Sequence, residues 1–237
     1  MKPILILKTG QTIAGLLRHG EDFEDWIVEG AQLGAEHFCV VDAAAGHSLP
    51  ALAGFAGIIV TGSPAMVTDR ASWSEECARY ICEAYSVNMP ILGICYGHQL
   101  LAHACGGEVG YHPQGREIGT VDVDLFASAS TDPLFAALPT SFLGHTTHSQ
   151  SVLKLPPDAV LLAKSQHDPH QAFRLGKNAW GVQFHPEFRA EHMAAYIEER
   201  IDDLLQEKFD IEALRSGVRV TPEATSLLQK FVRLARA

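Results

Sequence analysis

Short apolar runs recur along this chain and alternate with stretches that have helical spacing. Short runs bounded by Gly, Pro, Ser or Asp are typical of buried β-strands. Six runs are expected to be strands: Ile4–Leu7, Phe38–Val41, Gly57–Val60, Ile91–Ile94, Ala159–Ala163 and Ala179–Phe184. Several are nearly continuous in apolar character, as parallel strands covered on both faces should be. The alternation predicts an α/β fold with a doubly wound, mostly parallel sheet.

The rest of the chain is expected to add strands and helices to this sheet. The segment from Thr120 to about Leu162 alternates β-like pieces with turns, which predicts an antiparallel portion. Glu191–Phe209 has apolar residues at helical spacing and predicts one amphipathic helix. A second helix is expected after Thr221, which can cap it, because a proline follows at the first helical position. We divide the chain into a main domain, residues 1–200, and a C-terminal helical extension packed on it, residues 201–237.

Charge and cysteine content narrow the classes of function. The chain has 28 acidic against 18 basic residues, a formal net charge of -10, so a polyanion such as nucleic acid would be repelled. Its five cysteines are odd in number and include no C-x-x-C pair, which favours a reducing cytoplasm over a disulfide framework. The apolar run after Pro3 is too short for a signal peptide, and no run is long enough to span a membrane. The sequence therefore predicts a cytoplasmic protein with neither a nucleic-acid nor a membrane partner.

Cys95 occupies the joint between an apolar run and a helical stretch, in the segment Gly93-Ile94-Cys95-Tyr96-Gly97. At such a strand-to-helix turn the central residue is a nucleophile held out into a cleft, and glycines fit where side chains would collide. The following helix directs its N-terminus at the sulfur, which lowers the pKa of a thiol. The backbone N–H of Tyr96 is placed to bind an oxyanion once the sulfur attacks a carbonyl. Cys95 is therefore the expected nucleophile, and the other four cysteines are interpreted as structural.

His185 is the expected base, because a thiol nucleophile needs a base and the base needs a group that orients it. It ends the last expected strand, in the segment His185-Pro186-Glu187. Pro186 stops the strand and fixes the backbone between its two neighbours. Glu187 is then near enough to accept a hydrogen bond from one ring nitrogen of His185, which leaves the other nitrogen to face the thiol.

These segments resemble a known family. "GICYGHQLL" and "GVQFHPEF", together with "IIVTGSPAMV" and "HSQSV", are similar to the class I, triad-type glutamine amidotransferases. The residues around the cysteine are most similar to the glutaminase domain of GMP synthases and its free-standing relatives. The resemblance implies a flavodoxin-like, three-layer sandwich with the active site at the carboxyl ends of the strands. It implies no metal and no organic cofactor.

The resemblance also implies a role for each matching residue. Cys95 would attack the side-chain amide of glutamine, His185 would transfer the proton, and Glu187 would hold His185. A γ-glutamyl thioester would form, ammonia would leave, and water would release glutamate. The backbone N–H groups of Gly62 and Tyr96 would form the oxyanion hole. The residues expected around the substrate are Ser63, Pro64, Gln99, His148, Ser149 and Gln150.

Two departures from the family pattern affect this interpretation. Gln150 stands where many members have an acidic residue, which argues against a charge contact with the amino group of the substrate. The chain also offers no room for the synthetase that would use the ammonia. We therefore expect either a separate ammonia-acceptor synthetase subunit, or a stand-alone γ-glutamyl peptidase that acts on small γ-glutamyl compounds with the same residues.

Two further interpretations come from other classes. Zinc-assisted hydrolysis is one, because His145-x-x-His148 and His167-x-x-His170 offer nitrogen ligands, although no Cys or Glu recurs at ligand spacing. A catalytically silent binding or regulatory module is the other. The presence of Cys95, His185 and Glu187 together argues against it.

Overall fold

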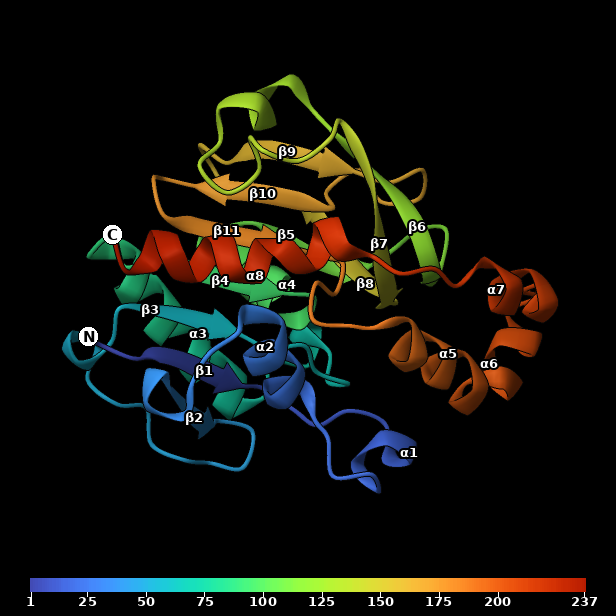
Figure 1. The fold of residues 1–237 in the computed structure, drawn as a ribbon, viewed down its shortest axis with the longest axis horizontal. Coiled ribbons are helices and arrows are strands. Elements are labelled where there is room, and N and C mark those ends of the chain that lie inside the picture. Colours follow the sequence, from blue (N-terminus) through green and yellow to red (C-terminus); the bar gives the residue numbers. More distant parts are fainter.

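A nine-stranded sheet with helices on both faces forms the centre of the molecule (Figure 1). Its strands lie in the order β2-β1-β3-β4-β11-β10-β9-β6-β7, while β5 and β8 form a separate two-stranded sheet. The computed structural model describes all 237 residues. The strands are β1 (Ile4–Lys8), β2 (Phe38–Asp42), β3 (Gly57–Val60), β4 (Ile91–Ile94), β5 (Glu108–Tyr111), β6 (Glu117–Leu125), β7 (Ser141–His148), β8 (Gln150–Lys154), β9 (Val160–Lys164), β10 (Ala172–Leu175) and β11 (Ala179–Val182).

Eight α-helices accompany these strands. They are α1 (Ala14–Leu17), α2 (Phe23–Ala31), α3 (Ser72–Ser86), α4 (Tyr96–Ala104), α5 (Ala190–Glu199), α6 (Ile201–Gln206), α7 (Ile211–Gly217) and α8 (Pro222–Ala235). No helix combines the length and the apolar composition that a bilayer span requires.

The large sheet has a parallel half and an antiparallel half. Neighbours in the series β2-β1-β3-β4-β11 pair in parallel. The strands β10, β9, β6 and β7 then extend the sheet by antiparallel pairs. Each of the six expected apolar runs is a strand, with ends that differ by at most two residues. The predictions of an α/β fold and of an antiparallel addition from the middle of the chain are confirmed.

Alternate residues of β1 show why both faces of the sheet are covered. Ile4 and Ile6 pack in a cluster with residues of α2 and α8, whereas Leu5 and Leu7 pack in a cluster with residues of α3 and α4. No solvent reaches any of the four side chains. Successive side chains of a strand point to opposite faces, so a continuous apolar run requires a helical layer on each side.

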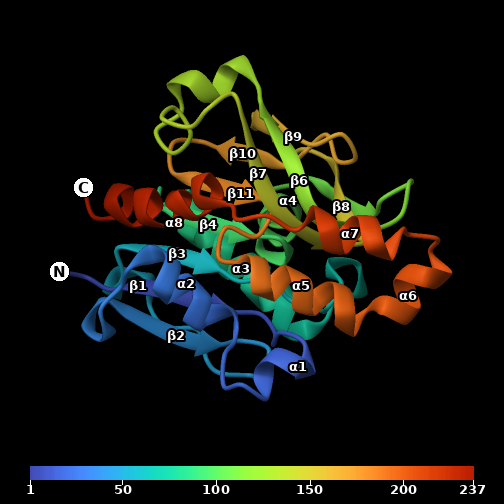
Figure 2. The same cartoon turned by 45° about the vertical axis from the view of Figure 1, so that its right-hand side comes forward.

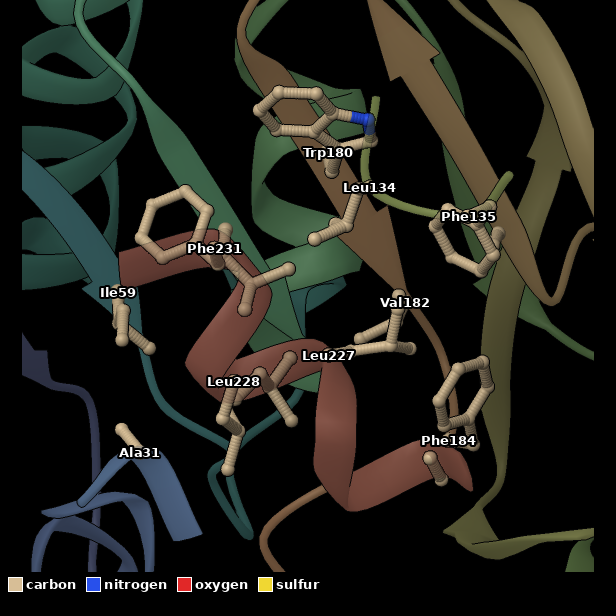
Figure 3. Close-up of a cluster of buried hydrophobic side chains, with 14 of the residues drawn as sticks. Ala31, Ile59, Leu134, Phe135, Trp180, Val182, Phe184, Leu227, Leu228 and Phe231 are labelled. Atoms are coloured by element: carbon tan, nitrogen blue, oxygen red, sulfur yellow. The ribbon is translucent and has the colours of Figure 1, made fainter. Parts of the chain in front are cut away.

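Helix α8 contributes to the same core as the parallel strands (Figure 3). Leu227, Leu228 and Phe231 are fully buried in the cluster that contains Ile59 and Trp180. The rings of Trp180 and Phe231 meet edge to face, with centroids 6.3 Å apart. The division of the chain at residue 200 stays a prediction. Whether or not residues 201–237 are counted as a separate extension, α8 packs against the central sheet.

The expectation of one helix over Glu191–Phe209 is wrong, because the chain breaks it at Arg200. Helix α5 ends before Arg200 and α6 begins after it, with a backbone φ of -107° and ψ of 16° between them. Helix α7, which the apolar spacing did not predict, follows. Figure 2 shows α5, α6 and α7 grouped on the right-hand side of the molecule, where α5 contacts α1 and β6. Thr221 precedes α8 as expected, but its hydroxyl forms no capping hydrogen bond.

Candidate active site

Cys95 lies at the turn between β4 and α4, at the carboxyl edge of the parallel strands. Its φ of 49° and ψ of -97° lie outside the regions that L-residues ordinarily adopt. The turn is held by hydrogen bonds from the Cys95 N–H to the carbonyl oxygen of Val182 (2.9 Å) and from the Gln99 N–H to the carbonyl oxygen of Cys95 (3.1 Å). Backbone conformations of this kind cluster at functional sites, where the surrounding structure holds them.

Glycines on either side of Cys95 allow this turn to form. A Cβ at Gly93 would lie 2.3 Å from the carbonyl oxygen of Gly97. A Cβ at Gly97 would lie 2.5 Å from the carbonyl oxygen of Val60 in β3. Both obstacles are backbone atoms, so only hydrogen fits at these two positions. The close approach of α4 to β3 and β4 is thus the physical reason for the spacing seen in the sequence.

His185 and Glu187 follow β11, the strand that pairs with β4, and their side chains contact each other. Nδ1 of His185 lies 2.7 Å from Oε1 of Glu187, and both residues are buried. The imidazole also stacks on the ring of Phe188, with centroids 4.1 Å apart. Because Nδ1 faces the carboxylate, Nε2 is the nitrogen left for another partner, and it forms no hydrogen bond within the protein.

Cys95 and His185 line the same cavity and alter each other's ionisation. Burial disfavours a thiolate, but the charges of His185 and His148 and the contact of the sulfur with His185 together outweigh burial and lower the pKa of Cys95 below its ordinary value of 9.0. Burial also disfavours an imidazolium, but the carboxylate of Glu187 and the sulfur of Cys95 outweigh it and raise the pKa of His185 to about 10. The arrangement therefore favours a thiolate beside an imidazolium.

The turn after β3 borders this cavity. Ser63 and Pro64 line it together with Cys95. Gly62 lies next to the imidazole of His185, since a Cβ built on Gly62 would lie 3.0 Å from Cε1 of His185. The turn after β3 therefore lies beside both Cys95 and His185.

The backbone N–H groups of Gly62 and Tyr96, beside Cys95, have no partner within a helix or strand. The hydroxyl of Thr9 lies 3.0 Å from the carbonyl oxygen of Thr61 and holds that peptide in position. The N–H of a trans peptide points opposite to its carbonyl, so the Gly62 N–H points away from Thr9. Tyr96 is the first residue of α4, and its N–H is one that the helix itself cannot satisfy. No sequence motif marks Thr9, which fixes the first of these groups.

A cavity of about 110 Å³ opens beside Cys95. The six residues expected around the substrate all line it: Ser63, Pro64, Gln99, His148, Ser149 and Gln150. Two further cationic residues line it as well, Arg116 and Arg200. The structure therefore brings the predicted substrate residues together and adds two arginines for which the sequence offers no motif.

Two glutamines in this cavity use their side-chain nitrogens within the protein. Nε2 of Gln99 donates to the carbonyl oxygen of Gln150 (2.7 Å) and to Oε1 of Gln183 (3.0 Å). Nε2 of Gln150 donates to the hydroxyl of Thr68 (2.5 Å). The side chain of Gln150 thus anchors the turn that contains Thr68.

His148 is a second buried histidine at the cavity wall. Its Nε2 lies 2.9 Å from Oε2 of Glu117 and its Nδ1 lies 3.0 Å from the carbonyl oxygen of Gln150. Both neighbours accept hydrogen bonds, so the ring carries two protons and a positive charge. Burial alone would lower the pKa of His148, but the bond to Glu117 together with the negative charges of Glu117 and Asp168 outweighs burial and raises the pKa. Ser165 and Gln171 each donate to Glu117 at 2.6 Å and fix the carboxylate.

The histidines considered as zinc ligands have other partners. His148 pairs with Glu117, and each of the others contacts a hydroxyl or a backbone carbonyl oxygen: His145, His167 and His170. No group of three or more His, Cys, Asp or Glu side chains lies close enough together to hold a metal ion.

Comparison with known proteins identifies the family of this chain. The family model for glutamine amidotransferase class-I matches residues 31–203. Over 134 residues, 56% of this chain, the sequence is 40% identical to "GMP synthase [glutamine-hydrolyzing]" of Bacillus pumilus (strain SAFR-032). Over 146 residues, 62% of this chain, it is 37% identical to the protein of that name from Aeropyrum pernix. These matches cover 24% and 26% of the two relatives, so the chain spans about a quarter of their length.

Solved structures share the fold at lower sequence identity. A glutamine amidotransferase from Thermotoga maritima superposes with a TM-score of 0.79 at 23% identity, covering 100% of each chain. A glutamine amidotransferase from Methylobacillus flagellatus gives a TM-score of 0.69 at 23% identity, covering 99% of this chain and 91% of the other. These structures establish the architecture, and the family match covers most of the sequence. The chain belongs to the class-I glutamine amidotransferase family.

Proposed function

We propose that the protein hydrolyses the side-chain amide of glutamine to glutamate and ammonia. Cys95 is the nucleophile, His185 the general acid and base, and Glu187 the residue that holds His185. The observation that carries this proposal is the buried pair of Cys95 and His185, with opposite pKa shifts, at a strand-to-helix turn. A lowered thiol pKa beside a raised imidazole pKa is what nucleophilic attack at neutral pH requires.

The reaction then proceeds in two acyl transfers. The Cys95 thiolate attacks the amide carbon of the substrate and forms a C–S bond. The imidazolium of His185 gives its proton to the amide nitrogen, the C–N bond breaks, and ammonia leaves a γ-glutamyl thioester. His185, now neutral, takes a proton from water, and the resulting hydroxide attacks the thioester carbon. The C–S bond breaks, glutamate leaves, and the thiolate and imidazolium are restored.

The amides of Gly62 and Tyr96 supply the oxyanion hole in this proposal. The negative oxygen that develops in each acyl transfer needs fixed donors that do not have to reorganise. The Gly62 N–H is oriented by the contact between Thr9 and the preceding carbonyl, and the Tyr96 N–H is oriented by the start of α4. The helix dipole adds a favourable field at the same place.

A second candidate function is hydrolysis of larger γ-glutamyl amides by the same residues. A cavity of about 70 Å³ lies on the His185 side of Cys95, between Phe23 and Tyr196. His185 protonates the leaving amine, so this is the side on which that amine departs. One water needs about 10–15 Å³ of such space, so this cavity has room for a leaving group larger than ammonia.

We also propose that, if ammonia is the useful product, a separate synthetase receives it. The relatives named above are GMP synthases, and this chain matches about a quarter of their length. In our proposal, the matching quarter is the part that hydrolyses glutamine. Addition of a purified acceptor synthetase would then raise the rate of glutamine hydrolysis by this chain.

The test is release of ammonia and of glutamate from glutamine by the purified protein, repeated with γ-glutamylglycine. We expect Cys95→Ala to lower the rate on the order of 10³-fold or more. Cys39→Ala, at an exposed cysteine, should leave the rate unchanged. Mass spectrometry of acid-quenched wild-type protein should show a γ-glutamyl adduct on Cys95. Equal rates for wild type and Cys95→Ala would contradict the proposal, and faster turnover of γ-glutamylglycine would favour the second candidate.

A further inference from the structure

Arg200 has an unusual position for a charged residue. It lies at the break between α5 and α6, and its side chain lines both cavities that meet at Cys95. One of these cavities contains the residues expected around the γ-glutamyl group, and the other contains His185. A ligand bound at Cys95 would therefore meet this guanidinium whether it extends into one cavity or into the other.

The guanidinium of Arg200 has no acceptor in the protein. It forms no hydrogen bond and no ion pair, and its Nε is shielded from solvent without a partner. The guanidinium lies over the ring of Tyr196, whose centroid is 5.9 Å from Cζ of Arg200. A buried donor without an acceptor costs free energy, so a site that keeps one is suited to a ligand that supplies the acceptor.

Arg116 in the same cavity provides the contrast. Its Nε and Nη2 donate to the two carboxylate oxygens of Glu207, at 3.0 and 2.9 Å. Glu207, whose pKa both arginines lower, thus already forms a paired contact with Arg116. The charge of Arg116 is neutralised locally, whereas that of Arg200 is not. The chain carries 28 acidic residues, and none of them pairs with Arg200.

We infer that Arg200 is a specificity-determining residue that binds a carboxylate of the γ-glutamyl substrate. This inference rests on the function proposed above. A guanidinium offers parallel N–H donors that match the two oxygens of a carboxylate, and such pairs are strong where solvent is limited. The carboxylate could be the α-carboxylate of the γ-glutamyl group or a carboxylate on the leaving amine, because Arg200 borders both cavities. The experiment separates these two sources.

Four substrates test the inference in pairs. Glutamine and glutamine α-amide differ only in the α-carboxylate. γ-Glutamylglycine and γ-glutamylglycinamide differ only in the carboxylate of the leaving amine. The value of kcat/KM is measured for each substrate with wild type, Arg200→Met, Arg200→Lys and the control Arg79→Met. Arg79 is an exposed residue of α3 that lines neither cavity.

Arg200→Met should lower kcat/KM about 10- to 100-fold for the substrate that carries the bound carboxylate, and leave its amide partner unchanged. Wild type should have a higher kcat/KM for the substrate with the bound carboxylate than for its amide partner, and Arg200→Met should have similar values for both. Arg200→Lys should restore part of the preference, because it keeps the charge and loses the paired geometry. Arg79→Met should behave as wild type. Loss of preference in the glutamine pair assigns the α-carboxylate, and loss in the other pair assigns the leaving amine.

Two results would overturn the inference while the proposed function stands. One is an equal loss of kcat/KM for all four substrates, which a purely structural role of Arg200 would give. The other is no change for any substrate. Absence of Cys95-dependent turnover by wild type would instead overturn the proposed function, and the inference with it. Thermal unfolding of each variant shows whether a general loss of activity comes from a loss of folded protein.

Discussion

Oε1 of Glu187 lies 2.7 Å from Nδ1 of His185, and the two residues are separated along the chain only by Pro186. The carboxylate and the imidazole are thus paired locally, before any distant part of the chain is added. What the fold contributes is the position of this pair beside Cys95, because β11 lies next to β4 in the sheet. The register places Val182 opposite Ile94, so the two strands end at the same level.

Glu187→Gln tests the importance of the carboxylate. The amide keeps the shape but loses the charge that stabilises the imidazolium, and it does not fix the ring tautomer. We expect kcat for glutamine to fall on the order of 10²- to 10⁴-fold. Steady-state kinetics checks this, with Glu191→Gln at an exposed position of α5 as the matched control. A loss below tenfold would show that Glu187 is not needed to orient His185.

The pH dependence of kcat/KM should be bell-shaped. The thiolate of Cys95 forms as the pH rises through its lowered pKa, so the acid limb lies below 9.0. The imidazolium of His185 loses its proton as the pH rises through about 10, so activity falls there. The two limbs describe the pair rather than either residue alone. The rate of alkylation of Cys95 by iodoacetamide, followed from pH 5 to 11, gives an independent measure. A thiol that becomes reactive only above pH 9 would contradict this expectation.

Gly93→Ala should destabilise the protein strongly. The added methyl would lie 2.3 Å from a backbone oxygen of α4, and relieving this contact requires the strand and the helix to separate. Overpacking of this kind costs about 1–3 kcal/mol or more in the free energy of unfolding. Gly217→Ala is the control, because nothing lies within 4 Å of the added atom there. Urea unfolding of both variants measures the difference, and equal midpoints would contradict the explanation given for the glycine spacing.

Glu117→Gln should destabilise the protein, and more so at lower pH. The pKa of His148 is raised in the folded state, so its contribution to stability is fully present below its unfolded value near 6.5. That contribution is lost as the pH rises through the raised folded value. Breaking a buried ion pair on one side costs about 3–5 kcal/mol. Urea unfolding at pH 6 and pH 9 should show a larger difference from wild type at pH 6, and Glu212→Gln at an exposed site should show none.

Phe231→Ala tests whether α8 is integral to the core. The ring is fully buried against Trp180, and its removal should cost about 3–5 kcal/mol in the free energy of unfolding. Leu205→Ala, at a residue of α6 that is 58% exposed, should change it by less than about 0.5 kcal/mol. Similar small losses for both would mean that the C-terminal helices are accessory to a domain that folds without them.

The strands could be predicted from the sequence because both faces of the sheet are covered. A strand buried on two sides must be apolar at nearly every position, and β1, β3 and β4 are completely buried. The glycines around Cys95 were likewise visible, since a close backbone approach leaves few alternatives. These features depend on local sequence, and a periodicity or a spacing therefore reveals them.

The break at Arg200 could not be predicted in this way. Ile197, Ile201 and Leu204 keep helical spacing across it, so the apolar pattern is the same for one helix or two. Thr9 and Arg200 also gave no signal, because each lies far from Cys95 in the sequence and no motif marks either of them. They reach the site only because the sheet and the break between α5 and α6 place them there.

The unusual backbone angles of Cys95 have one further consequence. A glycine would adopt them more easily, so Cys95→Gly would relieve backbone strain at this turn and remove the sulfur that we propose as the nucleophile. In the proposed function, the conformation that presents this sulfur is therefore maintained at a cost in stability.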